Sequence, residues 1–263
     1  MKNGLEDYYV IRGNKKMRFG YTTGSCAAAA CKGAAEILLG GVMQKAVTLM
    51  TPKGILLTLE LKDVRIEEDR VTCAIQKDAG DDPDTTNGIL VYATVQKTKE
   101  PGIILDGGVG VGRVTKAGLS QKIGEAAINP VPKAMILREA TEIAEKYDIR
   151  GLHLLAAEDN ELNAEIIEML LTDDGAKVTV AKNGRQAVEH FENNPPGTFD
   201  AILMDVMMPV MDGIAATKAI RAMDRPDAKT IPIIAMTANA FEEDAKRCLA
   251  AGMTAHLAKP FQI

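Results

Sequence analysis

Residues 200–213 read Asp-Ala-Ile-Leu-Met-Asp-Val-Met-Met-Pro-Val-Met-Asp-Gly, and this stretch decides the fold of the second part of the chain. Its first six residues are a largely apolar run of strand length that ends at the carboxylate Asp205. Pro209 and the pair Asp212-Gly213 then break the pattern. Such a run is typical of a strand buried on both faces of a parallel sheet, where functional groups lie beyond the carboxyl ends of the strands. Asp205 is therefore the first candidate functional residue.

The segments around this strand alternate between strand and helix patterns. We expect further strands at residues 152–157, 176–181, 231–236 and 255–258, and helices at 161–172, 185–193, 213–223 and 240–251. Strict alternation predicts a doubly wound, parallel five-stranded sheet, which is the flavodoxin-like α/β fold.

Five polar residues fall at the ends of these strands or directly beyond them: Glu158, Asp159, Asp205, Thr237 and Lys259. Parallel strands end at the same edge of a sheet, so the five side chains are expected along one rim. Three clustered carboxylates repel one another and are tolerated best with a cation between them. Hard oxygen ligands of this kind suit Mg²⁺. A single strand-end aspartate is commonly a helix cap, but the set of five predicts a metal and phosphoryl site.

With its strand-end residues, the segment 152–263 closely resembles the receiver domain of two-component signalling, especially receivers of hybrid histidine kinases. The resemblance implies that Asp205 is the phosphoacceptor and that Glu158, Asp159, Asp205 and the backbone carbonyl of Met207 hold Mg²⁺. It implies that Thr237 and Lys259 bind the phosphoryl group, and that a histidine kinase or phosphotransfer domain is the partner. The family has one more helix than this sequence, and we expect the amphipathic segment 133–147 to cover part of the exposed sheet.

The first part of the chain has a different sequence pattern. Residues 27–39 are rich in alanine and predict a helix, which Thr23 or Ser25 can cap at its start. Gly40-Gly41 ends this helix. We expect residues 1–19 to be a partly ordered lead-in. Short alternating strands follow at residues 46–50, 55–61, 64, 71–75 and 89–95, with a tight turn at 52–54. Sparse helices among short strands predict an α+β domain.

Two loops of this part carry possible ligand groups. Residues 77–88 form an acidic Gly/Pro loop that can bind a divalent cation or be a solvated turn; it lacks the ligand order of a calcium loop. Residues 103–112 show a strand followed by glycines, as in nucleotide sites, but no helix start follows, which argues against an ordinary dinucleotide fold. The helix start at residues 22–25 can bind an anion or can simply be a well-capped buried helix.

Together, residues 20–26, 78–88, 107–118 and 128–132 resemble cobalt-precorrin-5B C(1)-methyltransferases of anaerobic cobalamin synthesis, over about residues 17–148. The resemblance implies S-adenosylmethionine as methyl donor and a corrinoid substrate, although the family continues into a second α/β half that is not recognisable here. The residues it suggests for the tetrapyrrole or S-adenosylmethionine are Thr22, Thr23, Ser25, Asp81, Asp82, Gly108, Gly110 and Gly112.

The 263 residues therefore divide into an expected methyltransferase-like domain at 1–149 and a receiver domain at 150–263. A net charge of -5 argues against non-specific nucleic-acid binding. With neither a leader nor an apolar span in the sequence, a cytoplasmic protein without a membrane partner is expected. The four cysteines are expected as reduced thiols, since their spacing fits no zinc site. We expect a Mg²⁺-dependent phosphoacceptor module; the alternatives are a corrin-pathway methyltransferase and a fusion of two fragments without joint function.

Overall fold

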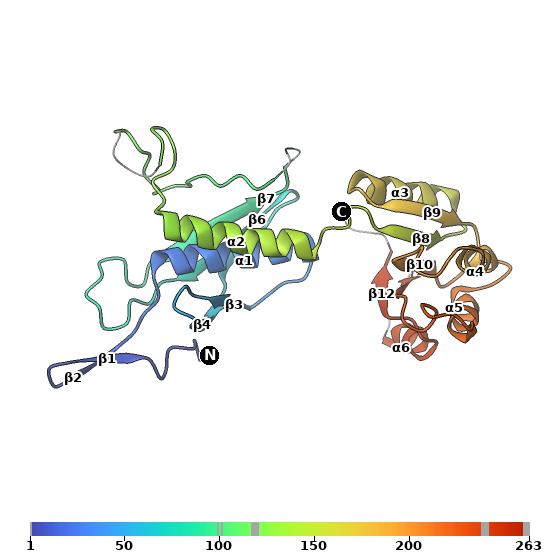
Figure 1. Ribbon diagram of the computed structural model, residues 1–263, viewed down its shortest axis with the longest axis horizontal. Helices are drawn as coiled ribbons and strands as arrows, with labels where there is room; N and C mark the ends of the chain where they lie inside the picture. The colour runs from blue at the N-terminus through green and yellow to red at the C-terminus, as the bar shows by residue number, and fades with distance from the viewer. Residues whose placement is uncertain (1, 99, 101, 117–120, 238–241, 260–263) are drawn as a thin grey trace. The chain divides into compact units, whose positions relative to one another are not determined.

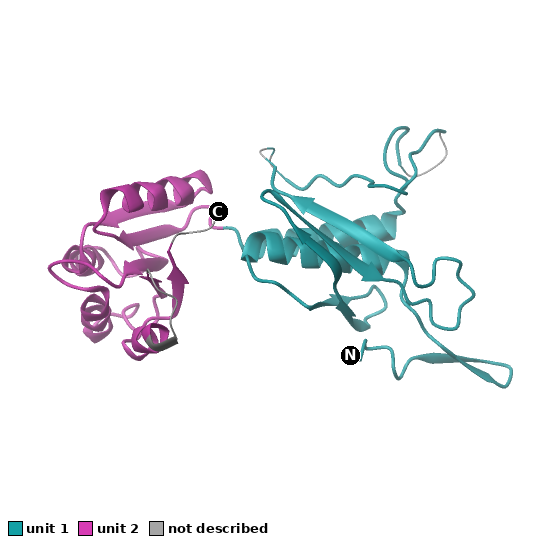
Figure 2. Ribbon diagram, turned by 180° about the vertical axis from the view of Figure 1, so that it is seen from behind, with its two compact units in different colours: residues 1–148 teal, residues 149–263 magenta. Residues whose placement is uncertain are grey.

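The computed structural model describes residues 2–98, 100, 102–116, 121–237 and 242–259. The chain forms two compact units, Met1–Asp148 and Ile149–Ile263 (Figure 2). Each unit has its own buried core, and the two are described separately below. Over the described residues, no helix has the length and apolar character needed to cross a membrane.

Unit 1 is an α+β domain, as expected from the sequence. Its elements are β1 (Tyr9–Arg12), β2 (Lys15–Arg18), α1 (Thr23–Gly40), β3 (Ala46–Met50), β4 (Leu56–Glu60), β5 (Lys62–Ile66), β6 (Arg70–Gln76), β7 (Leu90–Gln96) and α2 (Pro130–Lys146). The pairs β1–β2 and β3–β4 are antiparallel hairpins, and β5-β6-β7 is an antiparallel sheet. The core lies between the strands β3–β7 and the helices α1 and α2.

The helices α1 and α2 pack side by side and run in the same direction (Figure 1). A Cβ added to Gly24, at the start of α1, would lie 2.7 Å from the Cγ of Pro132, at the start of α2. At the other ends, a Cβ on Gly40 would lie 2.5 Å from the Tyr147 hydroxyl. Small residues on α1 therefore allow the close approach of α2.

Four expectations for unit 1 were wrong. Residues 9–18 form a hairpin and Leu5 is buried, whereas only a partly ordered lead-in was expected here. Thr22, rather than Thr23 or Ser25, caps α1 by accepting a hydrogen bond from the Ser25 N–H. Residues 103–106 form no strand and belong to no sheet. The apolar face of α2 packs into the unit 1 core through Met135 and Ile136, so this face is not available to cover the receiver sheet.

Unit 2 contains the predicted doubly wound sheet. Its elements are β8 (His153–Ala157), α3 (Glu161–Asp173), β9 (Lys177–Ala181), α4 (Gly184–Asn193), β10 (Ala201–Asp205), α5 (Gly213–Ala222), β11 (Ile233–Thr237), α6 (Glu242–Ala250) and β12 (Ala255–Ala258). All five strands are parallel in the order β12-β11-β10-β8-β9. This is the flavodoxin-like order, and the expected fold class is confirmed. The expected start of the last helix, at residue 240, lies outside the described residues.

Helices cover both faces of this sheet. Phe191 from α4, Ile220 from α5 and Cys248 from α6 are buried in one apolar cluster with the strands. Ile167 and Leu171 from α3 pack in a second cluster with Ala156 and Met236. The central strands β8, β10 and β11 are consequently apolar on both sides, and their polar side chains are concentrated at their ends.

Candidate functional site: an acidic cluster at the sheet edge

The carboxyl edge of the unit 2 sheet gathers the side chains that the sequence predicted there. Glu158 directly follows β8 and Asp205 is the last residue of β10. With Asp159 they form a group in which one carboxylate oxygen from each of the three residues lies within 4.8 Å of the other two. Glu158 and Asp205 are buried, whereas Asp159 is exposed. Two of the three charges are therefore held where water screens them poorly.

Lys259, directly after β12, reaches this cluster from the edge strand. Its Nζ lies 2.6 Å from the Oδ2 of Asp205 and also donates to the Oε2 of Glu158. Its own backbone N–H donates to the carbonyl oxygen of Thr237, the last residue of β11, over 2.7 Å. Thr237 is itself buried. Lys259 thus links three of the neighbouring strand ends.

The contacts of Lys259 maintain its positive charge. Burial is the largest single influence on its pKa and lowers it, but the hydrogen bonds and charges of Asp205 and Glu158 together outweigh burial. The pKa of Lys259 is therefore raised above its ordinary value. An ammonium that stays charged in this position compensates part of the acidic cluster.

Sequence reasoning missed two residues that shape this site. The side-chain amide of Asn163 donates to the Oε1 of Glu158 over 3.0 Å, which orients the buried carboxylate. Gly213 begins α5 where a Cβ would lie 2.1 Å from the backbone oxygen of Asp205, so no other residue fits without displacing the strand end. The pair Asp212-Gly213 suggested only a turn, while Asn163 has no sequence signal apart from its helix position.

Met207 takes part in the site through its backbone. Its N–H donates to the Oδ1 of Asp205 over 3.1 Å, while its side chain is 80% exposed. This bond and that from Lys259 hold one oxygen each of the Asp205 carboxylate. The expected role of the Met207 carbonyl as a metal ligand remains a prediction.

The donor set fits a small divalent cation. Three carboxylates and one ammonium leave two negative charges when all four groups are ionised, and all three acids supply the hard oxygen ligands that Mg²⁺ prefers. The exposed Asp159 keeps one side of the cluster open to water, which Mg²⁺ usually retains in its coordination shell. The acidic residues would hold the ion, and the ion would neutralise charge on a phosphoryl group.

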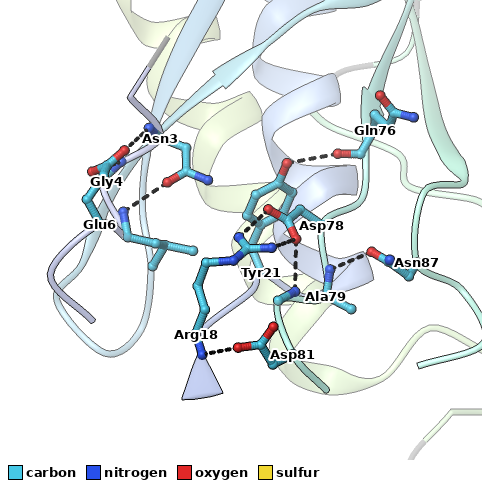
Figure 3. A network of polar contacts seen from close by, with 12 residues as sticks. Asn3, Gly4, Glu6, Arg18, Tyr21, Gln76, Asp78, Ala79, Asp81 and Asn87 are labelled. Atoms are coloured by element: carbon cyan, nitrogen blue, oxygen red, sulfur yellow. Dashed lines mark hydrogen bonds and ion pairs between the residues drawn. The ribbon is translucent and has the colours of Figure 1, made fainter. Parts of the chain in front are cut away.

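The acidic loop of unit 1 forms no comparable cluster. Its aspartates instead bind arginine and lysine side chains and backbone N–H groups of the same unit (Figure 3). Asp78 accepts two hydrogen bonds from the Arg18 guanidinium, at 2.6 and 2.9 Å. Asp81 accepts from the Arg18 backbone N–H over 2.7 Å. Asp84 pairs with the buried Lys77, which lowers the pKa of that carboxyl well below its ordinary value. Asp82 is exposed.

The other candidate residues of unit 1 lie in two places. Thr22, Thr23 and Ser25 form the first turn of α1, next to the acidic loop, since the Tyr21 N–H donates to the Asp78 carbonyl over 2.8 Å. Gly108, Gly110 and Gly112 belong to a segment that folds back on residues 124–128, where the Ala127 N–H donates to the Gly112 carbonyl. Their expected role in binding a tetrapyrrole or S-adenosylmethionine remains a prediction.

All four cysteines are buried free thiols. Burial raises the pKa of Cys26 to about 12, and it raises the pKa values of Cys31 and Cys73 to about 11. The thiolate is the reactive form of cysteine, so these side chains serve as apolar core residues.

Comparison with known proteins assigns both units. A family model described as CbiD matches residues 10–167, and a model described as response regulator receiver domain matches residues 154–263. The protein is thus a two-part fusion of an enzyme-related domain and a signalling domain. The chain belongs to the CbiD family, and its second part is a receiver domain.

The similar curated proteins are named cobalt-precorrin-5B C(1)-methyltransferase. That of Ruminiclostridium cellulolyticum is 46% identical over 155 residues, covering 58% of this chain and 40% of the relative. That of Alkaliphilus oremlandii is 48% identical over 144 residues, covering 54% of this chain and 40% of the relative. The chain thus spans about 40% of the length of these relatives.

Solved structures match the second part. The receiver domain of the sensor histidine kinase PA1611 from Pseudomonas aeruginosa, described with a magnesium ion in its active site cleft, is 46% identical. The match covers 42% of this chain and 87% of that one, with a TM-score of 0.38. The receiver domain of Ssk1 from Saccharomyces cerevisiae, solved with the phosphotransfer protein Ypd1, is 28% identical over 43% of this chain and 81% of that one, with a TM-score of 0.38.

Proposed function

We propose that unit 2 accepts a phosphoryl group on Asp205 in a Mg²⁺-dependent reaction and that the donor is a phosphohistidine of a kinase or phosphotransfer domain. The observation that carries the proposal is the convergence of Glu158, Asp159 and Asp205 with Lys259 at one edge of a receiver-type sheet. The family match over residues 154–263 agrees with it.

In this reaction, a carboxylate oxygen of Asp205 attacks the phosphorus atom while the bond from phosphorus to the donor breaks. Phosphoryl transfer depends mainly on positioning and on neutralising charge. The Met207 N–H and Lys259 hold the Asp205 carboxylate in one orientation. When bound, Mg²⁺ would supply additional positive charge toward the phosphoryl oxygens. We infer that Lys259 then pairs with the new dianion and that the Thr237 hydroxyl donates to it.

Incubation with acetyl phosphate and Mg²⁺ tests the proposal. We expect phosphoryl labelling of the wild-type chain and its loss in Asp205→Ala, because the nucleophile is gone. Asp200→Ala is the matched control, since Asp200 precedes the same strand at its other end and should label normally. Equal labelling of Asp205→Ala would refute the assignment.

A second candidate function is methyl transfer from S-adenosylmethionine to a cobalt-precorrin by unit 1. It is favoured by the 46–48% identity to proteins named for this activity. Methyl transfer requires donor and acceptor to be held together. Calorimetric titration of the chain with S-adenosylmethionine is the direct test: saturable binding would support this candidate, and no binding at millimolar ligand would remove it.

A further inference from the structure

The β1–β2 hairpin of unit 1 extends away from the rest of that unit (Figure 1). Its strands are joined by the two-residue loop Gly13-Asn14, and its side chains are almost all exposed. Tyr9, Val10 and Ile11 are 45%, 42% and 67% exposed. A two-stranded hairpin that buries so little is at best marginally stable in water.

Nevertheless, the hairpin is anchored at its N-terminal root. Leu5 is buried in the unit 1 core, and the Thr58 N–H donates to the Asn3 carbonyl over 3.0 Å. A Cβ on Gly4 would lie 2.2 Å from the Leu56 carbonyl oxygen, so the chain is pressed directly against β4. This contact fixes where β1 begins.

The C-terminal root is held in the same way by the acidic loop (Figure 3). Arg18 exchanges backbone and side-chain hydrogen bonds with Asp78 and Asp81. A Cβ on Gly20 would lie 2.2 Å from the Ala79 carbonyl carbon. The hairpin is therefore anchored at both of its roots, although its strands bury almost nothing against the described part of the chain.

The two edges of the hairpin differ. The Phe19 N–H donates to the Tyr8 carbonyl, so Tyr8 and Phe19 are a hydrogen-bonded pair of the ladder. In an antiparallel pair, every second residue of a strand bonds to the partner strand. The N–H and C=O groups of Tyr9 and Ile11 therefore point away from β2. In the described part of the chain these outward groups have no backbone partner. On β2, the equivalent outward groups of Arg18 bond to the Asp81 side chain and N–H. The β1 edge is open and the β2 edge is closed at one end.

We propose that the open β1 edge pairs with β1 of a second copy of this chain. An antiparallel register with the two-fold axis at Val10 lets the outward groups of Tyr9 bond to those of Ile11 on both sides of the axis. In that register Val10 lies opposite Val10 of the other copy, and Tyr9 lies opposite its Ile11. The two hairpins form one four-stranded sheet, which satisfies the open edge and gives it aromatic–aliphatic cross-strand pairs.

The charges of the two strands favour pairing of β1 with β1 of a second copy over pairing of β2 with β2. In the proposed register Arg12 faces Tyr8 of the other copy, so no like charges meet across the axis. The corresponding pairing of two β2 strands would place Lys16 opposite Arg18, and like charges directly opposite each other are destabilising. The β1 edge is therefore complementary to itself, while the β2 edge repels itself.

Sedimentation equilibrium tests the proposal, without Mg²⁺ or phosphodonor and in an Asp205→Ala background that excludes phosphorylation-driven association. We expect a concentration-dependent dimer of the 28.2 kDa chain. Val10→Lys and Val10→Glu should each weaken dimerisation at least about tenfold, because each places like charges face to face. An equimolar mixture of the two should dimerise again. Met17→Lys, which adds the same charge on the other strand, should leave the dimer intact.

A cross-link provides an independent measurement. Val10→Cys should form an intermolecular disulfide under mild oxidation, because non-hydrogen-bonded antiparallel pairs bring their Cα atoms closest. Met17→Cys should not, and the four native thiols are buried. The proposal is overturned by a chain that stays monomeric up to about 1 mM, by Val10→Lys dimers of unchanged affinity, or by equal cross-linking of both cysteine variants. Circular dichroism of each variant excludes unfolding as the cause.

Discussion

Val210 adopts a backbone conformation that is unfavourable for its residue type. Its φ is 68°, in the left-handed region, and a β-branched side chain there is strained. The side chain is 76% exposed and so gains little from packing. We expect Val210→Gly and Val210→Asn to stabilise unit 2 by about 1 kcal/mol, since both residues accept this conformation more readily. Urea denaturation of the variants measures the effect.

Val210→Ala is the matched control for that prediction. It removes the same exposed methyl groups but keeps the Cβ, so it should recover only part of the stabilisation. If all three variants were equally stable, side-chain exposure rather than backbone strain would be the cause.

We expect His153, at the start of β8, to make the stability of unit 2 depend on pH. Its ring lies 4.7 Å from Phe199 and its Nε2 lies 2.8 Å from the Thr179 hydroxyl. Burial, with a smaller contribution from Lys177, lowers the pKa of His153 below its ordinary value of 6.5. Protonation therefore favours the unfolded chain, and stability should fall as pH drops below about 6.5 toward the lowered pKa.

The measurement is the urea midpoint of unit 2 between pH 8 and pH 5. His153→Gln, which keeps a hydrogen-bonding side chain without the charge, should flatten the slope in this range. A slope that survives the substitution would assign the pH dependence to other groups.

At the scale of elements, one buried ion pair joins the two parallel helices of unit 1. The Lys32 ammonium lies 2.9 Å from Glu139, whose side chain is only 3% exposed. Glu139→Ala should destabilise unit 1 by about 3 kcal/mol, because it leaves a partly buried ammonium without its partner. Combined replacement as Lys32→Met with Glu139→Leu should cost much less, since neither charge is then buried. Urea denaturation of Lys32→Met, Glu139→Leu and the combined variant completes a double-mutant cycle, which measures the coupling of the pair, and Glu139→Ala is measured beside it.

The receiver fold and its acidic cluster were predictable from sequence because both follow from strand periodicity. Five apolar segments alternating with helices leave only a parallel sheet, and the carboxyl ends of parallel strands share an edge. Residues directly after different strands, such as Glu158 and Lys259, then meet although 101 positions separate them.

The features that escaped prediction depend on contacts with no local signal. Glu139 has the pattern of a surface helix residue, and its burial is compensated by Lys32 on the neighbouring helix and by the adjacent Arg138. The β1–β2 hairpin was missed because its many charged residues mask the alternation of a strand. Arg18 anchors it to Asp78 across 60 positions of sequence, which no periodicity reveals.

At the scale of the whole molecule, the two units should unfold as separate steps. Each has its own core, and the chain divides between Asp148 and Ile149. Scanning calorimetry should resolve two transitions. Mg²⁺ should raise the midpoint of the unit 2 transition alone, because a ligand stabilises the unit that binds it. Asp205→Asn should reduce this shift while leaving the unit 1 transition unchanged.

The dependence of the acidic cluster on Lys259 also bears on how the protein matures at the ribosome. Glu158 and Asp205 are synthesised 101 and 54 residues before the ammonium that balances them. Until Lys259 is made, the two carboxylates lack the ammonium that offsets their repulsion, so we expect these strand ends to come together late or with a dissolved cation bound. Late translation of one lysine would then set the moment at which the signalling unit matures.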